Sequence, residues 1–136
     1  MSDPGYSSTP LVKKLNLRDG MRVWFHAMPE DVHEEIDEYA LELLFVADPD
    51  EGIDAAHIFV SECAELAVLL TSLYGQISAD AQVWVSWPNQ ASGLPTDINE
   101  DAIRELAHPL GYIDTKVLAV DEAWNGLKLV IRKELR

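Results

Sequence analysis

The sequence predicts a three-layer α/β/α domain around a mostly parallel sheet of about six strands, with an antiparallel hairpin at its C-terminal end. Short, almost continuous apolar runs at 55–60 and 82–87 are typical of strands buried on both faces of a parallel sheet. Segments with helical periodicity alternate with such runs, as in βαβ units. Asn125-Gly126, between the last two predicted strands, is the strongest short hairpin signal in the chain. These features describe a Rossmann-like domain.

The predicted elements follow the order β-α-β-β-α-β-α-β-β within a single domain of 136 residues, after a loose tail at 1–8 and a short helix that starts at Pro10. Strands are expected at 21–25, 41–47, 55–60, 82–87, 112–121 and 127–132. Helices are expected at 31–39, at 62–77, and from a cap at Asp97 or Asn99 to Leu110. Ser61 is the predicted N-cap of the second of these helices, and Gly111 the stop after the third.

The charge of the chain excludes some classes of partner. The net charge is −14, from 24 acidic and 10 basic residues, and a field of that sign repels nucleic acid and anionic membrane surfaces. No apolar stretch approaches the roughly 18 residues of a membrane span, and the N-terminus shows no signal-peptide pattern, so a cytoplasmic location is expected. The one cysteine, Cys63, has no internal disulfide partner and is interpreted as a small hydrophobe. The four histidines are too scattered to predict a metal site.

The candidate ligand site lies where the parallel strands end, because ligands of open α/β sheets bind outside the carboxyl ends of the strands. A Trp-Pro wall, serines and a helix N-terminus at this edge are suited to a small planar or anionic group. The candidate ligand-binding residues are Lys13, Lys14, His26, Ser61, Ser86, Trp87 and Asn89. The simpler interpretations stay open: Trp87 fills a gap in the core, the two lysines are solvated, and His26 is a structural histidine. No catalytic residue is assigned, because no group completes a triad with His26.

Three segments resemble the adenosylmethionine-dependent methyltransferases of the Rossmann-like class. They are the approach to the first strand (17–23), the middle strand (54–60) and the approach to the hairpin (111–114). The resemblance implies the fold of those enzymes in a truncated, glycine-poor form. One helix–strand unit is missing after the second strand, and the corner after the first strand, His26-Ala27-Met28, has no glycine to admit a cofactor to the backbone. We therefore expect no bound cofactor, although Asp48 stands where an acidic residue would hold a ribose.

The chain also resembles a small bacterial family known only as a domain of unknown function. The segments that carry this resemblance are 6–11, 13–14, 84–88, 92–93, 96–97 and 124–128. Asn89 and Asn125 stand where a lysine and a serine are expected in that family, which weakens an anion-binding role of the loop after Pro88. The family implies a fold and no activity.

Three functions are compatible with these observations. The favoured one is a non-catalytic, methyltransferase-like module that binds a protein partner or a small ligand. The second is an enzyme of unknown reaction that uses a cleft near Trp87. The third is a structural homo-oligomer, such as a homodimer, assembled through the C-terminal hairpin. Binding without chemistry is favoured because no acid, base or nucleophile pair occupies compatible positions.

Overall fold

A computed structural model describes residues 9–135, so the predicted tail at 1–8 lies outside the described residues. Its six strands form one sheet in the order β2-β1-β3-β4-β6-β5. The strands are β1 (Arg22–His26), β2 (Leu44–Phe45), β3 (Ala55–Phe59), β4 (Gln82–Pro88), β5 (Tyr112–Ala119) and β6 (Trp124–Ile131). The first four are parallel, whereas β6 pairs antiparallel with β4 and with β5. The predicted fold class is therefore confirmed.

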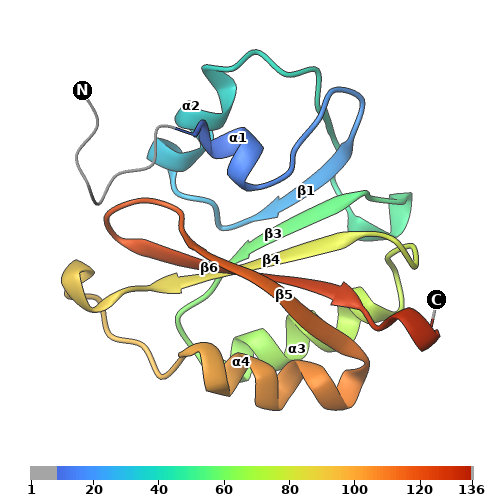
Figure 1. The fold of residues 1–136 in the computed structure, drawn as a ribbon, viewed down its shortest axis with the longest axis vertical. Helices are drawn as coiled ribbons and strands as arrows, with labels where there is room; N and C mark the ends of the chain where they lie inside the picture. The colour runs from blue at the N-terminus through green and yellow to red at the C-terminus, as the bar shows by residue number, and fades with distance from the viewer. Residues whose placement is uncertain (1–8, 136) are drawn as a thin grey trace.

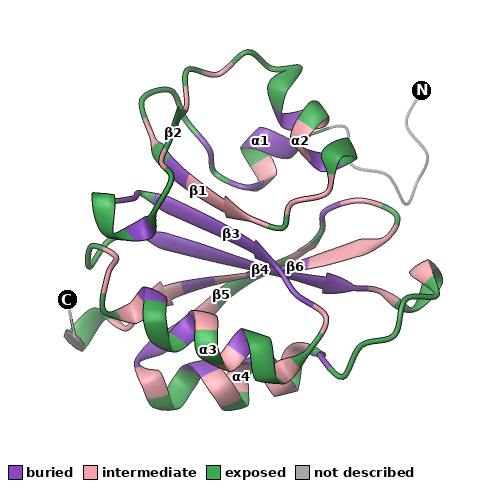
Figure 2. Cartoon of the chain, turned by 180° about the vertical axis from the view of Figure 1, so that it is seen from behind, coloured by how far each residue is buried: buried purple, intermediate pink, exposed green. Residues whose placement is uncertain are grey.

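Helices cover both faces of this sheet (Figure 1). On one face lie α1 (Leu11–Lys14) and α2 (Glu30–Asp37), and on the other α3 (Cys63–Tyr74) and α4 (Glu100–Ala107). Between these layers, β3 and β4 are buried along their whole lengths (Figure 2). Burial on both faces explains why these two strands have the most continuous apolar sequences in the chain.

Alternate residues of the central strands contribute to two separate cores. Val83, Val85 and Trp87 of β4 pack toward α3 and α4, together with Leu66 and Leu70 of α3. The opposite face of the same strand places Trp84 against α1 and α2. Trp84 is the largest side chain among those with under 2% exposure, and its indole Nε1 donates a hydrogen bond to the Leu15 carbonyl oxygen at 3.0 Å. Trp84 therefore links the end of α1 to the middle of the sheet.

The second strand is much shorter than the predicted 41–47. Only Leu44 and Phe45 form β2, at the edge of the sheet, and their side chains are 53% and 54% exposed. In the described part of the chain no strand lies outside β2, so the apolar run there has no second neighbour to bury it.

The prediction that Asn125-Gly126 forms the hairpin turn is wrong. Both residues lie inside β6, and the turn is made earlier, at 120–124, by the Asp121 carboxylate. Asp121 Oδ1 accepts hydrogen bonds from the backbone N–H groups of Ala123 (2.8 Å) and Trp124 (2.9 Å), which is the ordinary chemistry of an Asp turn. Gly126 is required for a different reason. A Cβ atom at this position would lie 3.0 Å from Val120 Cγ2 and 3.5 Å from the Trp84 ring.

This close approach predicts that Gly126→Ala destabilises the fold through overpacking. We expect the free energy of unfolding to fall by about 1–3 kcal/mol, because the Cβ must displace the Val120 side chain. Urea unfolding followed by tryptophan fluorescence measures the change. The control is Gly75→Ala at the end of α3, where φ is −83° and the nearest atom to a new Cβ lies at 4.0 Å. Equal stability of Gly126→Ala and the wild type would show that β6 has room at this point.

Candidate functional site

The switch point of the sheet lies between β1 and β3. After β1 the chain crosses to β2 on one side, and after β3 it crosses to β4 on the other side. Ligands of such sheets bind in the crevice outside the carboxyl ends of the strands at this point. In this chain the crevice is bounded by the corner after His26 and by the start of α3.

The corner after β1 keeps a left-handed backbone without a glycine. Ala27 has φ +55°, a conformation that a side chain makes costly. His26, half-buried beside it, places Nε2 3.4 Å from Glu65 Oε2 of α3 and lies against the Trp24 ring. The corner therefore has the left-handed turn of a cofactor-binding loop, but the side chains of His26 and Ala27 stand where glycines would leave the backbone open.

The N-terminus of α3 is occupied by a carboxylate of the chain itself. Asp97 Oδ1 accepts a hydrogen bond from the Cys63 backbone N–H at 2.7 Å. The same loop is held by Thr96, whose hydroxyl donates to the Ser61 carbonyl oxygen at 2.7 Å. Burial and the hydrogen bond to Asp97 raise the pKa of the Cys63 thiol, which makes it a poorer nucleophile. The Asp97 carboxylate thus occupies the position at which the N-terminus of α3 would bind an anion.

Each helix that starts at this edge also carries carboxylates in its first turn. They are Glu30 and Asp31 in α2, Glu65 in α3, and Glu100 and Asp101 in α4. Acidic side chains at these positions stabilise the helices through their dipoles. The same charges oppose the binding of a phosphate or carboxylate at the carboxyl edge.

Trp87 and Asn89 lie beside a cavity of about 750 Å³ next to the start of α4. Trp87 is only 5% exposed and belongs to the core under α3 and α4. The Asn89 amide is used in the fold: its Nδ2 donates to the Glu122 carbonyl oxygen at 2.6 Å, and its Oδ1 accepts from the Ser92 N–H at 3.0 Å. Binding at this cavity stays a prediction.

Ser86 does not reach the carboxyl edge. It is completely buried, and its Oγ lies 2.7 Å from His57 Nε2 on the neighbouring strand. His57 stacks on Phe59 with ring centroids 4.5 Å apart, and its Nδ1 has no hydrogen-bond partner among the described residues. Burial lowers the pKa of His57 to about 3, so the imidazole is neutral in the folded protein. The sequence signal for this pair was a polar residue inside each of two apolar runs, His57 in 55–60 and Ser86 in 82–87.

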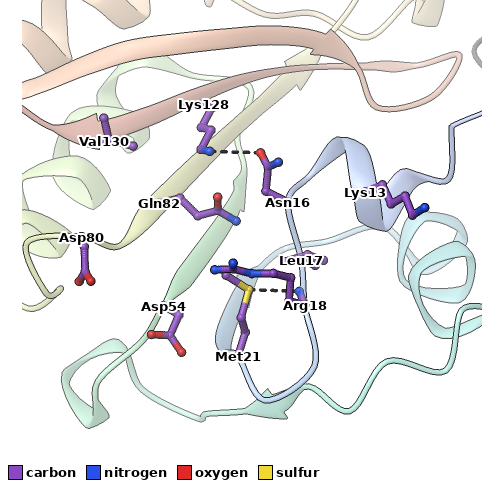
Figure 3. A pocket seen from close by; sticks show the side chains of 10 residues that line it. All are labelled: Lys13, Asn16, Leu17, Arg18, Met21, Asp54, Asp80, Gln82, Lys128 and Val130. Carbon is purple, nitrogen blue, oxygen red and sulfur yellow. Dashed lines mark hydrogen bonds between the residues drawn. The ribbon is translucent and has the colours of Figure 1, made fainter.

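Lys13 and Lys14 lie on α1, away from the switch point. Lys14 Nζ is 3.4 Å from the Ala119 carbonyl oxygen at the end of β5. Lys13 lines a different cavity, at the amino ends of β1, β3 and β4 (Figure 3). The structure thus places His26 and Ser61 at one edge, away from the lysines, whereas the hydroxyl of Ser86 points into the core toward His57.

In residues 9–135 no group of three or more His, Cys, Asp or Glu side chains is arranged to hold a metal ion. The same part of the chain contains no helix with the length and hydropathy needed to cross a membrane.

Comparison with models of known families shows which family the chain belongs to. The model of a family described as "Protein of unknown function (DUF3052)" matches residues 12–133. The chain belongs to this family. The predicted relationship to a domain-of-unknown-function family is therefore confirmed, and a search of curated proteins gives no match.

Solved structures with a similar fold are methyltransferases. The DUF3052 chain is similar to magnesium protoporphyrin IX methyltransferase from Synechocystis PCC 6803 with bound SAH (TM-score 0.59, 12% identity, covering 90% of this chain and 78% of that one). It is also similar to ribosomal protein L11 methylase from Lactobacillus delbrueckii subsp. bulgaricus (TM-score 0.54, 11% identity, covering 90% of this chain and 75% of that one). A third similar structure is Aeropyrum pernix fibrillarin in complex with natively bound S-adenosyl-L-methionine. Its TM-score is 0.53 at 9% identity, and the match covers 93% of this chain and 70% of that one. At these identities the likeness shows the fold alone.

The carboxyl edge of the DUF3052 chain does not fit the S-adenosyl-L-methionine that the fold implies. Asp97 already takes the Cys63 N–H, and Ala27 projects a methyl group from the turn. Asp48, the candidate for the ribose, is also engaged: its Oδ1 accepts from the Asp50 N–H at 3.1 Å in a capping box with Glu51. Asp97 and one oxygen of Asp48 therefore already have roles in the fold.

The buried His57 makes stability depend on pH. In the unfolded chain the imidazole binds a proton near its ordinary pKa of 6.5, whereas in the folded protein it stays neutral down to about pH 3. The unfolded state therefore binds more protons between these values, and this group lowers the free energy of unfolding as the pH falls through that window.

His57→Gln keeps a hydrogen-bonding partner for Ser86 Oγ and removes the titration. Between pH 7 and pH 4 the free energy of unfolding of the wild type should therefore fall by about 3 kcal/mol more than that of the variant. Urea unfolding at pH 7, 5 and 4 gives the difference. A constant difference between wild type and His57→Gln would show that His57 titrates normally in the fold.

Proposed function

We propose that this chain is a non-catalytic, methyltransferase-like module that binds a small ligand or a protein partner and transfers no methyl group. The observation that carries the proposal is the hydrogen bond of 2.7 Å between Asp97 Oδ1 and the Cys63 N–H. It places a fixed negative charge of the chain at the helix N-terminus that faces the switch point. A cofactor can bind there only if it displaces this cap.

The side chains around the switch point supply no reactive pair that supports catalysis. His26 Nε2 lies 3.4 Å from the Glu65 carboxylate, and neither side chain forms a hydrogen bond with a hydroxyl or thiol of residues 9–135. The raised pKa of the Cys63 thiol works against a nucleophilic role. An enzyme that uses the cleft near Trp87 has less support, because Glu100, the titratable residue lining that cavity, is bound to Arg104 at 3.0 Å.

Titration calorimetry with S-adenosyl-L-methionine tests the proposal. At roughly millimolar cofactor we expect no heat above dilution, because the Cys63 N–H is already bonded to Asp97 and the corner after β1 has side chains in place of glycine. Fibrillarin from Aeropyrum pernix, measured in the same buffer, is the positive control for the cofactor. A micromolar dissociation constant, worth about −8 kcal/mol, would overturn the proposal and favour a methyltransferase.

A homodimer through the C-terminal hairpin is the second candidate. Strand β5 is a free edge of eight residues, with Ile113 42% and Val117 52% exposed. Two features of the same strand oppose edge pairing, namely the bulge between Asp114 and Lys116 and the lysine itself. Because these two features oppose pairing of β5 with a second copy, we favour the ligand-binding module over the dimer.

Sedimentation velocity distinguishes the two candidates. A dimer through β5 requires a mass of twice 15.2 kDa at tens of micromolar protein, and Val117→Lys should then restore the monomer. Leu94→Lys, an equally exposed apolar site in the loop before α4, is the control. A monomer mass for the wild type at every concentration would eliminate the dimer.

A further inference from the structure

Half of the chain's ten basic residues gather on one side of the molecule. Arg18, Lys116 and Lys128 form what we call the basic cluster, and Lys13 and Lys14 of α1 lie next to it. The three members come from the loop before β1, from β5 and from β6. In a chain of net charge −14, an arrangement that brings these cations together needs a physical reason.

The basic cluster has no carboxylate partner in residues 9–135. Lys128 Nζ donates to Asn16 Oδ1 at 3.1 Å, and Lys116 Nζ donates to the Lys14 carbonyl oxygen at 3.0 Å. The Arg18 guanidinium forms no hydrogen bond or ion pair with a described residue. Neutral oxygens thus hold the two ammonium groups in place and leave their charge uncompensated.

Arg104, outside the basic cluster, shows the contrast. Its guanidinium contacts three carboxylates, those of Glu100, Asp101 and Asp114, at 3.0 to 3.2 Å. Carboxylates are abundant in this chain, so their exclusion from the basic cluster does not follow from composition.

The cations of the basic cluster repel one another. Lys116 and Lys128 lie directly opposite on paired strands, an arrangement that destabilises a sheet. The pKa of Lys128 is lowered, first by burial and then by the charges of Lys116 and Arg18. An anion between these groups would remove the repulsion and replace the lost hydration with charge-assisted hydrogen bonds.

A cavity of about 450 Å³ opens beside the basic cluster (Figure 3). Arg18 and Lys128 line it on one side, and Asp54 and Asp80 on the other, with Gln82 between them. Its volume is in the range of small-molecule sites. The walls have opposite charge, so the cavity suits a ligand that is anionic at one end and carries ammonium or hydroxyl donors at the other.

The carboxylates on the far wall are held by the fold. Asp54 Oδ2 accepts from the Arg22 backbone N–H at 2.9 Å, and Asp80 Oδ1 accepts from the Ser78 hydroxyl at 3.1 Å. Each carboxylate keeps a second oxygen for a ligand donor. Their negative charge, added to that of the whole chain, disfavours a polyanion such as nucleic acid.

We propose that this cavity binds a small phosphate monoester that also carries an ammonium or hydroxyl group. The phosphate lies against Arg18 and Lys128, with Lys116 adding to the field, and the donor group faces Asp54 and Asp80. A phosphate dianion matches several converging cations, and the Arg18 fork suits two of its oxygens. The inference rests on the proposed function, since it names the ligand class of a binding module, but it uses a site at the opposite end of the sheet from the switch point.

The test is a titration of the full chain followed by ¹H–¹⁵N correlation NMR at constant ionic strength. The probes are O-phosphoethanolamine, inorganic phosphate and ethanolamine. We expect phosphoethanolamine to shift the amides of Asn16, Arg18, Asp54, Gln82 and Lys128. It should bind at least about fivefold more tightly than inorganic phosphate, and ethanolamine should bind more weakly than either.

Three variants assign the two walls. Lys128→Gln and Arg18→Gln should each weaken both phosphate probes about tenfold, whereas Asp80→Asn should weaken phosphoethanolamine alone. Lys133→Gln, which removes an exposed cation in the short helix after β6, is the matched control and should leave all constants unchanged. The dispersion of each variant's spectrum verifies that it folds.

The proposal would be overturned by several results. They are the absence of shifts at these amides, equal constants for phosphate and phosphoethanolamine, an equal effect of Lys133→Gln, and tighter binding of a single-stranded oligonucleotide. None of these results bears on the calorimetry with S-adenosyl-L-methionine, so either proposal can fail while the other stands.

Discussion

The carbonyl oxygen of Leu15 is the acceptor on which the arrangement of the N-terminal half depends. It receives hydrogen bonds from Gln82 Nε2 at 2.9 Å and from Trp84 Nε1 at 3.0 Å, both from β4, which is buried along its whole length. Helix α1 has four residues and is too short to be stable alone, so this anchor, with Leu11 and Leu15 in the core, fixes its position. Asn16 follows with φ +58°, as residues after a helix end often do. The anchor therefore also orients the Asn16 oxygen that holds Lys128.

The two ends of the sheet carry opposite chemistry. At the carboxyl ends, every helix start bears the chain's own carboxylates, and Asp97 bonds directly to the first turn of α3. At the amino ends, cations from three distant segments converge without carboxylate partners. In parallel α/β sheets the helix N-termini normally make the carboxyl edge attractive to anions. In this chain the acids cancel that attraction, and the remaining attraction for an anion lies at the other end.

Much of the fold was predictable because it follows from local rules. The apolar runs located the buried strands, Asn99 caps α4 through the Ala102 N–H as its position suggested, and Gly111, with φ +113°, closes the segment after α4. The turn at 120–124 was missed because Asn-Gly is a stronger local signal than Asp121, and only the packing of Trp84 and Val120 explains Gly126. The basic cluster was beyond sequence reasoning. Lys13 and Lys14 were singled out, but Arg18, Lys116 and Lys128 are separated by up to 110 positions and meet only through strand pairing.

The chain shares its fold with solved methyltransferases, and the side chains at its carboxyl edge have roles in the fold. Ala27 still adopts the left-handed turn after β1, at a cost that a glycine would avoid. The side chains around that turn have been used for capping and ion pairs, which stabilise the fold but block the crevice. The amino edge adjoins the end of α1, where the carbonyl oxygens of Lys14 and Leu15 accept hydrogen bonds from side chains of β4 and β5. Lys116 bonds to one such oxygen, that of Lys14. A neutral acceptor of this kind orients an ammonium group without neutralising it, and this leaves the charge available to a ligand.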